Sequence, residues 1–207
     1  MANDVPRPQR ADAARNYDKI VRAARAVYAE RGPDAQLEEI ARRAGVGNAT
    51  LYRHFPDKAA LIRAILDQTF AEHIAPVIEE ALADDDPRRS LATVLEAALS
   101  LAIRERNVLA TATNVGALTA KAGARFFESL TLLTRRGQQA GVIRADLVPE
   151  DLLRAIAMLV GVLPTMDPQS DGWRRYLTLV LDALSPAAAT PLPPAVPVVP
   201  GGSGRWI

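Results

Sequence analysis

The chain offers few of the side chains from which a catalytic or metal site is built. It contains no cysteine and only two histidines, His54 and His73, whose separation matches no common metal-binding motif. Residues 84–184 contain neither His nor Cys, so that stretch has no nucleophile–base pair. Its three consecutive aspartates, residues 84–86, stand at an expected helix start, where capping and solvation explain them. We therefore expect no enzyme activity, no bound metal and no cofactor.

Polar groups are instead concentrated between Leu37 and Phe55, LEEIARRAGVGNATLYRHF, which predicts two short helices joined by a tight turn. Apolar residues recur in the first helix at i, i+3, i+4 and i+7. Gly45 ends this helix, because the residue just past a helix end often needs a positive φ. A second helix follows Gly47 and returns its apolar residues to the same core.

Three positions of this stretch have the spacing of a helix-turn-helix: Ala41, Gly45 and Leu51. The small alanine lets the helices cross closely, the glycine forms the turn, and the leucine fills the wedge between them. The second helix is then held outward, ready for a DNA major groove. An ordinary corner between two helices of a helical domain is the alternative interpretation.

Charge and composition agree with a helical protein that meets nucleic acid. Residues 1–70 carry twelve Lys/Arg and nine Asp/Glu, a net charge of +3, whereas residues 71–207 carry thirteen and fifteen, a net charge of −2. Apolar residues make up 49% of the chain and aromatic residues 5%, which favours an all-helical fold of about nine helices. No apolar run reaches membrane-spanning length, so we expect a cytoplasmic protein without a membrane partner.

The chain divides into four predicted segments. Residues 1–14 form a flexible arm, residues 15–60 a three-helix DNA-binding domain, residues 61–184 a helical regulatory and dimerisation domain, and residues 185–207 a proline-rich disordered tail of which Trp206 has no assigned role. The first helix carries a stripe at Ile20, Ala24, Val27 and Tyr28. Asp57 caps a long helix that extends to residue 82, with a kink near Pro76.

Residues 15–66, and above all GVGNATLYRHFPDKAAL, resemble the DNA-binding domain of TetR-family transcriptional regulators. The pattern T-L-Y-x-H-F-x-x-K of that family runs here from Thr50 to Lys58. Gly47 and Gln36 depart from it, because the family often has serine and threonine at these positions. Lys58 lies in the first turn of a helix, where a lysine opposes the helix dipole, so we expect an external anion such as a DNA phosphate nearby.

The resemblance implies two groups of DNA contacts. Base edges would be met from the early and outward side of the second helix, where asparagine can pair with adenine and arginine with guanine. The base-reading residues are Asn48, Ala49 and Arg53. Phosphate oxygens would be bound by Gln36, Gly47, Thr50, Tyr52, His54 and Lys58. Tyr52 and His54 could instead pack against the core, and Arg53 could be a solvated surface charge.

Helices between residues 84 and 140 could enclose a small-molecule pocket, as the regulatory domains of the family do. Asp86 and Pro87 begin the first of these helices, and Asn107 can cap a shorter one that reaches Leu118. Four residues are candidates to line the pocket: Thr111, Asn114, Phe127 and Thr131.

The last two helices predict self-association. The helix from Pro149 to Leu163 is apolar at nearly every position and must be covered on more than one side. A further amphipathic helix begins at Trp173, and two such hairpins could form a four-helix interface about a two-fold axis. The residues expected there are Leu153, Ile156, Val160, Trp173, Tyr176, Leu177, Val180 and Leu184. A monomer that buries both helices internally is the alternative.

These patterns together predict a ligand-responsive repressor that binds a pseudo-palindromic operator in double-stranded DNA as a homodimer. A small-molecule effector would favour a state in which the long helix, residues 57–82, moves the two DNA-binding domains out of register. The alternative is a sequence-tolerant architectural DNA-binding protein without an effector, whose binding would depend steeply on salt.

Overall fold

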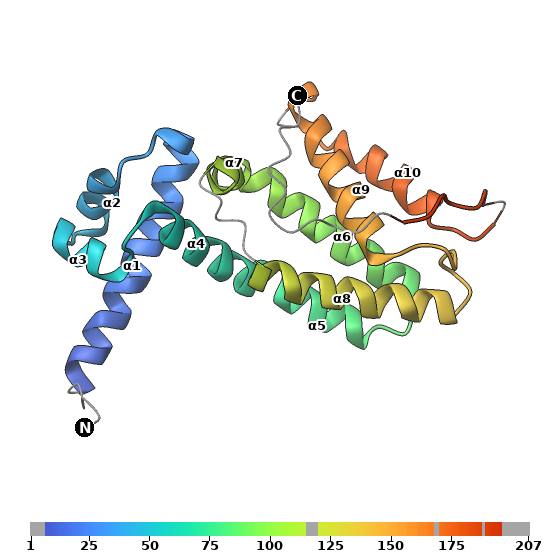
Figure 1. The fold of residues 1–207 in the computed structure, drawn as a ribbon, viewed down its shortest axis with the longest axis horizontal. Coiled ribbons are helices and arrows are strands. Elements are labelled where there is room, and N and C mark those ends of the chain that lie inside the picture. The colour runs from blue at the N-terminus through green and yellow to red at the C-terminus, as the bar shows by residue number, and fades with distance from the viewer. Residues whose placement is uncertain (1–6, 115–119, 168–169, 188, 196–207) are drawn as a thin grey trace. The chain divides into compact units, whose positions relative to one another are not determined.

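The described residues form only helices. The structure, a computed structural model, describes residues 7–114, 120–167, 170–187 and 189–195. Within those ranges it contains ten α-helices, two short 3-10 helices and no strand, which confirms the predicted all-α class (Figure 1). The helix predicted over residues 57–82 is broken at Ile74 into α4 (Lys58–His73) and α5 (Ala75–Ala83). Counting these two as one kinked helix gives the predicted nine. Pro76, in the first turn of α5, lacks the N–H that a continuous helix would need.

The helices group into two compact units. The head comprises the described residues up to 68 together with 105–114, and the body comprises residues 69–104 and the described residues from 120 onward. The sequence predicted one boundary, after residue 60. The structure instead divides the chain inside α4, and it places α7 (Arg106–Asn114), from the middle of the chain, in the head.

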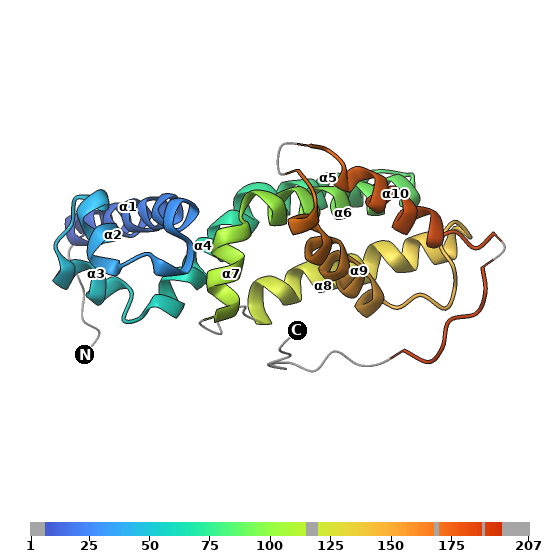
Figure 2. The same cartoon turned by 90° about the horizontal axis from the view of Figure 1, so that it is seen from above.

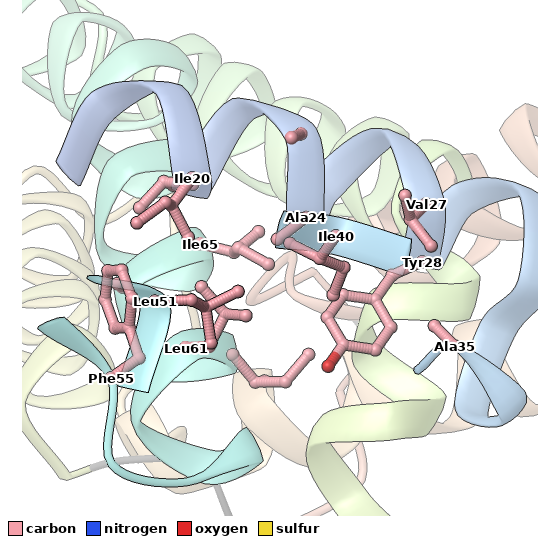
Figure 3. Packing of buried hydrophobic residues seen from close by; sticks show 14 of the residues in the cluster. Ile20, Ala24, Val27, Tyr28, Ala35, Ile40, Leu51, Phe55, Leu61 and Ile65 are labelled. Atoms are coloured by element: carbon pink, nitrogen blue, oxygen red, sulfur yellow. The ribbon is translucent and has the colours of Figure 1, made fainter. Parts of the chain in front are cut away.

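The apolar face of α1 (Arg7–Arg31) is the surface on which the head is built. The predicted stripe is fully buried: Ile20, Ala24, Val27 and Tyr28. Figure 3 shows these side chains converging with those of α2 (Leu37–Ala44), α3 (Asn48–His54) and α4. Because α2 has eight residues and α3 has seven, neither is long enough to be stable alone. Their helical state therefore depends on this shared core.

The mid-chain helix α7 completes the head core. Its Val108 and Ala112 are buried in the same cluster as the α1 stripe, and α7 packs against α1 and the 3-10 helix η1 (Gly32–Asp34). The prediction that Asn107 caps this helix is wrong. Asn107 lies inside α7, and its Nδ2 donates to the Ala29 carbonyl of α1 at 2.7 Å. Reasoning from local sequence could not identify the Ala29 carbonyl as the partner of Asn107, because the two residues are 78 positions apart.

The body is a layered arrangement of helices around a leucine-rich core. In Figures 1 and 2, α9 lies beside α6, α8 and α10, and α5 runs along α6. The bounds are α6 (Pro87–Arg104), α8 (Ala120–Gln139), α9 (Pro149–Val162), the 3-10 helix η2 (Leu163–Thr165) and α10 (Trp173–Ala183). Asp86 caps α6 as expected, because its Oδ1 accepts the N–H groups of Arg88 and Arg89 at 3.0 and 3.1 Å. None of the described helices combines the length and apolar character of a membrane span.

Charged side chains fasten the corner between α5 and α6. Arg136 of α8 donates to the carbonyls of Leu82 and Asp84 at 2.8 and 2.7 Å, which satisfies the end of α5. Arg89 donates to both carboxylate oxygens of Asp84. These hydrogen bonds from Arg89 lower the pKa of Asp84 to about 2. The corner is therefore held by backbone capping as well as by apolar contact.

Parts of both predicted terminal segments have defined structure within the described residues. The arm predicted over residues 1–14 is helical from Arg7 onward, and residues 1–6 lie outside the described range. In the tail, Asp146 accepts the N–H of Leu192 at 2.8 Å, and Arg144 donates to the carbonyl of Thr190. Residues 189–195 are therefore held against the loop after α8, while Trp206 lies outside the described residues.

Gly137 allows the chain after α8 to fold back onto the helix. The N–H groups of Val142 and Ile143 both donate to the Gly137 carbonyl, at 3.0 and 3.1 Å, and Gly141 has a φ of +68° in the turn. A Cβ on residue 137 would lie 2.4 Å from Cγ1 and 3.1 Å from Cβ of Ile143. These atoms cannot move without displacing the buried Ile143 side chain.

We expect Gly137→Ala to destabilise the protein by about 1–3 kcal/mol, the usual cost of overpacking a filled site. Urea unfolding monitored by circular dichroism measures this change. Gly161→Ala in α9 is the matched control, because a Cβ there meets nothing within 4 Å and alanine favours a helix by up to about 1 kcal/mol. Equal unfolding midpoints for the two variants would contradict the close contact at Gly137.

Candidate nucleic-acid interface

The turn between α2 and α3 is built around Gly45. Its φ of +68° and ψ of 34° are left-handed, and its N–H donates to the Ala41 and Arg42 carbonyls. The N–H of Val46 also donates to the Ala41 carbonyl, at 3.0 Å. Ala41 is 1% exposed and Leu51 is fully buried, so both belong to the head core. This geometry fixes α3 against α2 with one side turned away from the core.

The outward side of α3 carries polar and aromatic side chains. Asn48, Ala49, Tyr52 and Arg53 are all exposed, and Tyr52 keeps 45% of its surface open. Among the described residues, neither the Asn48 amide nor the Arg53 guanidinium has a protein hydrogen-bond partner. Both groups are therefore free to donate to an external molecule. The arrangement follows from the helical period, since Leu51 and Phe55 take the core side.

The expected phosphate ligands differ in how available they are. Gly47 and Gln36 are exposed and Thr50 is half-buried. Gln36 makes no side-chain cap of α2, and its Nε2 donates to the Asp34 carbonyl at 3.0 Å. These residues lie at the starts of α2 and α3, so the structure leaves their backbone and side chains near the surface of the head.

Lys58 does not need the external anion that its position suggested. Its Nζ donates to the carbonyls of Pro33 and Ala35, at 2.5 and 3.1 Å, and lies 5.5 Å from the ring centroid of Tyr28. The argument from the helix dipole is therefore wrong as evidence for a phosphate, because the ammonium has acceptors within the head. Two of its three N–H donors hold the segment before α2, and one remains.

His54 packs inward rather than presenting Nε2 to the surface. That nitrogen is buried without a hydrogen-bond partner, and the imidazole lies 6.3 Å from the Phe55 ring and 6.4 Å from the Tyr17 ring. The alternative interpretation, in which His54 covers Phe55, fits this geometry better than a phosphate ligand does.

Tyr17 is a residue of this region that sequence reasoning missed. It lies on α1 three residues before Ile20, which is the spacing of the buried stripe, and its ring is 5.0 Å from that of Phe55. Burial, with Asp67 and Asp18 nearby, raises the pKa of its phenol. Tyr17 therefore supports the end of α3 with a neutral ring.

A shallow hollow lies beside the start of α2. It is lined by Arg31, Gln36, Glu38, Glu39 and Arg42. Two arginines and two glutamates cancel in charge, so this hollow does not by itself attract phosphate. Gln36, a predicted phosphate ligand, thus has acidic as well as basic neighbours.

The residues expected to line an effector pocket are divided between the two units. Thr111 is buried in the head, where its hydroxyl donates to the Asn107 carbonyl at 2.8 Å. Phe127 and Thr131 are half-buried in the body, and the Thr131 hydroxyl donates to the Phe127 carbonyl. The side chain of Asn114 lies outside the described residues. Thr134, missed by sequence reasoning, is 1% exposed in the body with an unpartnered hydroxyl.

The residues expected at a dimer interface divide between core and surface. Trp173, Leu177 and Leu184 are buried in the body core, and Tyr176 is 41% exposed. Four others are half-buried: Leu153, Ile156, Val160 and Val180. Sequence reasoning missed the most exposed apolar side chains of these helices, Met158 on α9 and Leu179 on α10, which are 68% and 57% exposed. A nearly all-apolar α9 was the signal that could have identified Met158.

Comparison with known proteins connects this geometry to one family. The family model described as "Bacterial regulatory proteins, tetR family" matches residues 20–65. An uncharacterised HTH-type transcriptional regulator of Mycobacterium tuberculosis is 41% identical over 81 residues, which cover 39% of this chain and 41% of that protein. TtgW of Pseudomonas putida, also described as uncharacterised, is 39% identical over 63 residues, 30% of this chain and 47% of TtgW. The chain thus aligns with less than half the length of these curated relatives.

Solved structures extend the likeness over most of the chain. The TetR transcriptional regulator SCO0520 from Streptomyces coelicolor is 33% identical, with a TM-score of 0.61 over 83% of this chain and 99% of that protein. The regulator FadR from Bacillus subtilis has the same fold, with 23% identity and a TM-score of 0.67 over 82% of this chain and 97% of FadR.

We expect Lys58→Ala to destabilise the protein by about 1–2 kcal/mol, because two carbonyls lose a charged donor and Tyr28 loses its cation. Thermal unfolding at constant protein concentration measures the loss. Lys19→Ala removes an exposed lysine from the same unit and should leave the midpoint unchanged. A Lys58→Ala protein as stable as the Lys19→Ala protein would show that the ammonium does not hold the segment before α2.

Proposed function

This chain belongs to the TetR family of bacterial transcriptional regulators, and we propose that it binds a pseudo-palindromic DNA operator as a homodimer. The observation that carries the proposal is the outward side of α3, where Asn48 and Arg53 have donors with no protein partner. An asparagine amide can pair with adenine and an arginine with guanine in the major groove. In this proposal Ala49 faces the same groove and adds an apolar contact.

Phosphate contacts would fix the register of α3 on the duplex. Exposure of Gln36, Gly47 and Tyr52 supports this role, and the half-buried Thr50 lies in the first turn of α3. Lys58 can contribute only its remaining N–H donor, and His54 only after its ring turns outward. We therefore assign the main positioning role to the first four residues.

Self-association through α9 and α10 would bring a second head to the other half-site of the operator. Met158, Tyr176 and Leu179, which we call the α9–α10 patch, expose large apolar surfaces on two neighbouring helices. Burying such a patch against a second copy removes apolar surface from water at roughly 25 cal/mol per Å². A two-fold pair of α3 helices would then meet major grooves about 34–36 Å apart.

The body is proposed to bind a small-molecule effector that releases the operator. Among its described residues, the buried polar side chains are Thr69, Ser90 and Thr134, all hydroxyls without charge. Such an interior suits a mainly apolar, uncharged ligand group. FadR, which shares the fold, is seen in complex with stearoyl-CoA. Release requires only that the effector bind one state more tightly, and coupling is commonly about 1–3 kcal/mol.

Selection of binding sites from fragmented genomic DNA of the source organism, against random duplex near physiological salt, tests the proposal. A recovered inverted repeat, bound about a thousandfold or more tighter than random DNA, supports an operator-specific dimer. Equal retention of all fragments with a steep salt dependence would instead support an architectural protein without sequence preference. Retention of no fragment would contradict DNA binding by the protein without effector.

Arg53→Ala should relax base preference at one position of each half-site and cost about 1–3 kcal/mol on the selected operator. Competition binding against operators substituted one base pair at a time measures both effects. Arg22→Ala, which removes an exposed arginine from α1, is the matched control and should leave the preference unchanged. An Arg53→Ala protein with unaltered preference at every position would exclude Arg53 from base reading.

Leu179→Asp should shift the protein from dimer to monomer, because it places a charge in the proposed apolar interface. Sedimentation equilibrium should give 22.3 kDa for the variant and about twice that mass for the wild type. Leu132→Asp is the control, since Leu132 is 48% exposed on α8, outside the patch. Dimeric Leu179→Asp protein would place the interface elsewhere.

A further inference from the structure

The head includes α7, a helix that is separated along the chain from the other helices of the head by the body segment 69–104. Val108 and Ala112 of α7 are 1% and 0% exposed within the core formed by α1 to α4. The head segment of α4 ends at residue 68, so the two residues of α7 that close the head core come from a separate part of the chain. The head is complete only when α7 is seated on α1.

Polar bonds fix the start of α7 to α1 at two points. The Glu105 side chain is only 7% exposed, and its Oε1 accepts from Nη2 and Nε of Arg25 at 2.6 and 3.2 Å. Asn107 donates to the carbonyl of Ala29 at 2.7 Å. Arg25 and Ala29 are four residues apart, so these bonds hold one side of α1 over one helical turn.

The position of α1 determines where α3 lies. Ile20, Ala24 and Tyr28 of α1 are fully buried in the core that also contains Leu51 of α3, and Tyr17 contacts Phe55 just beyond α3. A shift of α1 must therefore move or loosen α3. Bonds that hold α1 act on α3 without contacting DNA.

Glu105 also stands where the chain leaves the body. It directly follows Arg104, the last residue of α6, and the boundary between the two units falls between these residues. Glu105 is therefore the first residue of the head after α6, and α7 begins directly after it at Arg106. The ion pair with Arg25 joins this position of the chain to α1.

We propose that the Glu105–Arg25 pair positions the DNA-binding surface, by fixing α1 to the α6–α7 junction and thereby holding the two α3 helices of a dimer at one spacing. This inference rests on the proposed dimeric DNA binding. Glu105 is a positioning residue that acts through Arg25, and its loss should release the spacing of the heads while each head remains able to bind a half-site.

The test measures affinity against half-site spacing. The selected inverted repeat is rebuilt with one or two base pairs inserted or removed at its centre, and each base pair rotates one half-site by about 34° about the DNA axis. The wild type should lose about tenfold or more in affinity at a two-base-pair change. Glu105→Gln should vary by less than about threefold across the same series, with weaker binding to the original operator.

Glu30→Gln is the matched control, because it removes another ion pair of the head, Arg43 with Glu30 at 2.7 Å, without touching α7. It should keep the spacing preference of the wild type. A Glu105→Gln protein that is less stable but retains the wild-type spacing preference would overturn the proposal and leave the pair a purely structural role. A wild-type protein with no spacing preference would overturn both this inference and the proposed dimeric function. That outcome is read from the wild-type protein alone, so it is distinct from a result obtained with the variants.

Asn107→Ala keeps the proposal falsifiable if Glu105→Gln fails to fold, since it removes only the bond to the Ala29 carbonyl. It should broaden the spacing preference partially, and an unchanged preference would overturn the proposal. A measurement without DNA is also possible because the chain has no cysteine. A spin label on Lys19→Cys reports the distance between heads in the dimer, and its distribution should widen with Glu105→Gln but not with Glu30→Gln.

Discussion

Burial of the apolar face of α1 is the interaction on which the head depends. The helices α2 and α3 are too short to persist in water by themselves, because helix nucleation costs more than a few hydrogen bonds return. They become ordered by placing Ile40 and Leu51 against the α1 stripe, with α4 and α7 closing the remaining sides. Every polar group on the outer side of α3 is positioned by this apolar contact and by the left-handed turn at Gly45.

The same packing explains why polar side chains of similar sequence context have different roles. Asn48 and Arg53 follow the side of α3 opposite to Leu51 and stay open to solvent. His54 lies one position from Phe55 and joins an aromatic cluster with Tyr17, which comes from another helix. Lys58 begins α4 but faces the carbonyls that precede α2. The partners that each side chain finds in the folded head therefore separate groups left open to solvent from groups that hold the head together.

Within the described residues, the chain connects the head and the body at two places. The chain passes between the units within α4 and again at the junction of α6 and α7, where Glu105 is bonded to Arg25. The body has an interior whose described buried polar groups are hydroxyls, and it exposes large apolar side chains on α9 and α10. In the proposed function the head supplies the DNA surface and the body supplies the ligand-responsive part. In this chain α4 crosses from the head to the body, whereas α6 ends in the body and α7 begins in the head.

The sequence by itself determined the features that depend on neighbours within about four residues. These are the α1 stripe, the turn at Gly45, the buried Leu51, and the caps Asp57 and Asp86, of which Asp57 accepts the Ala60 N–H at 2.6 Å. Only the tertiary structure decided the partners of Lys58, the inward turn of His54, the place of α7 in the head and the bonds that hold the tail at Asp146. The physical reason is distance along the chain. Helical periodicity and capping act locally, whereas each of these contacts joins groups that meet only after several helices have packed.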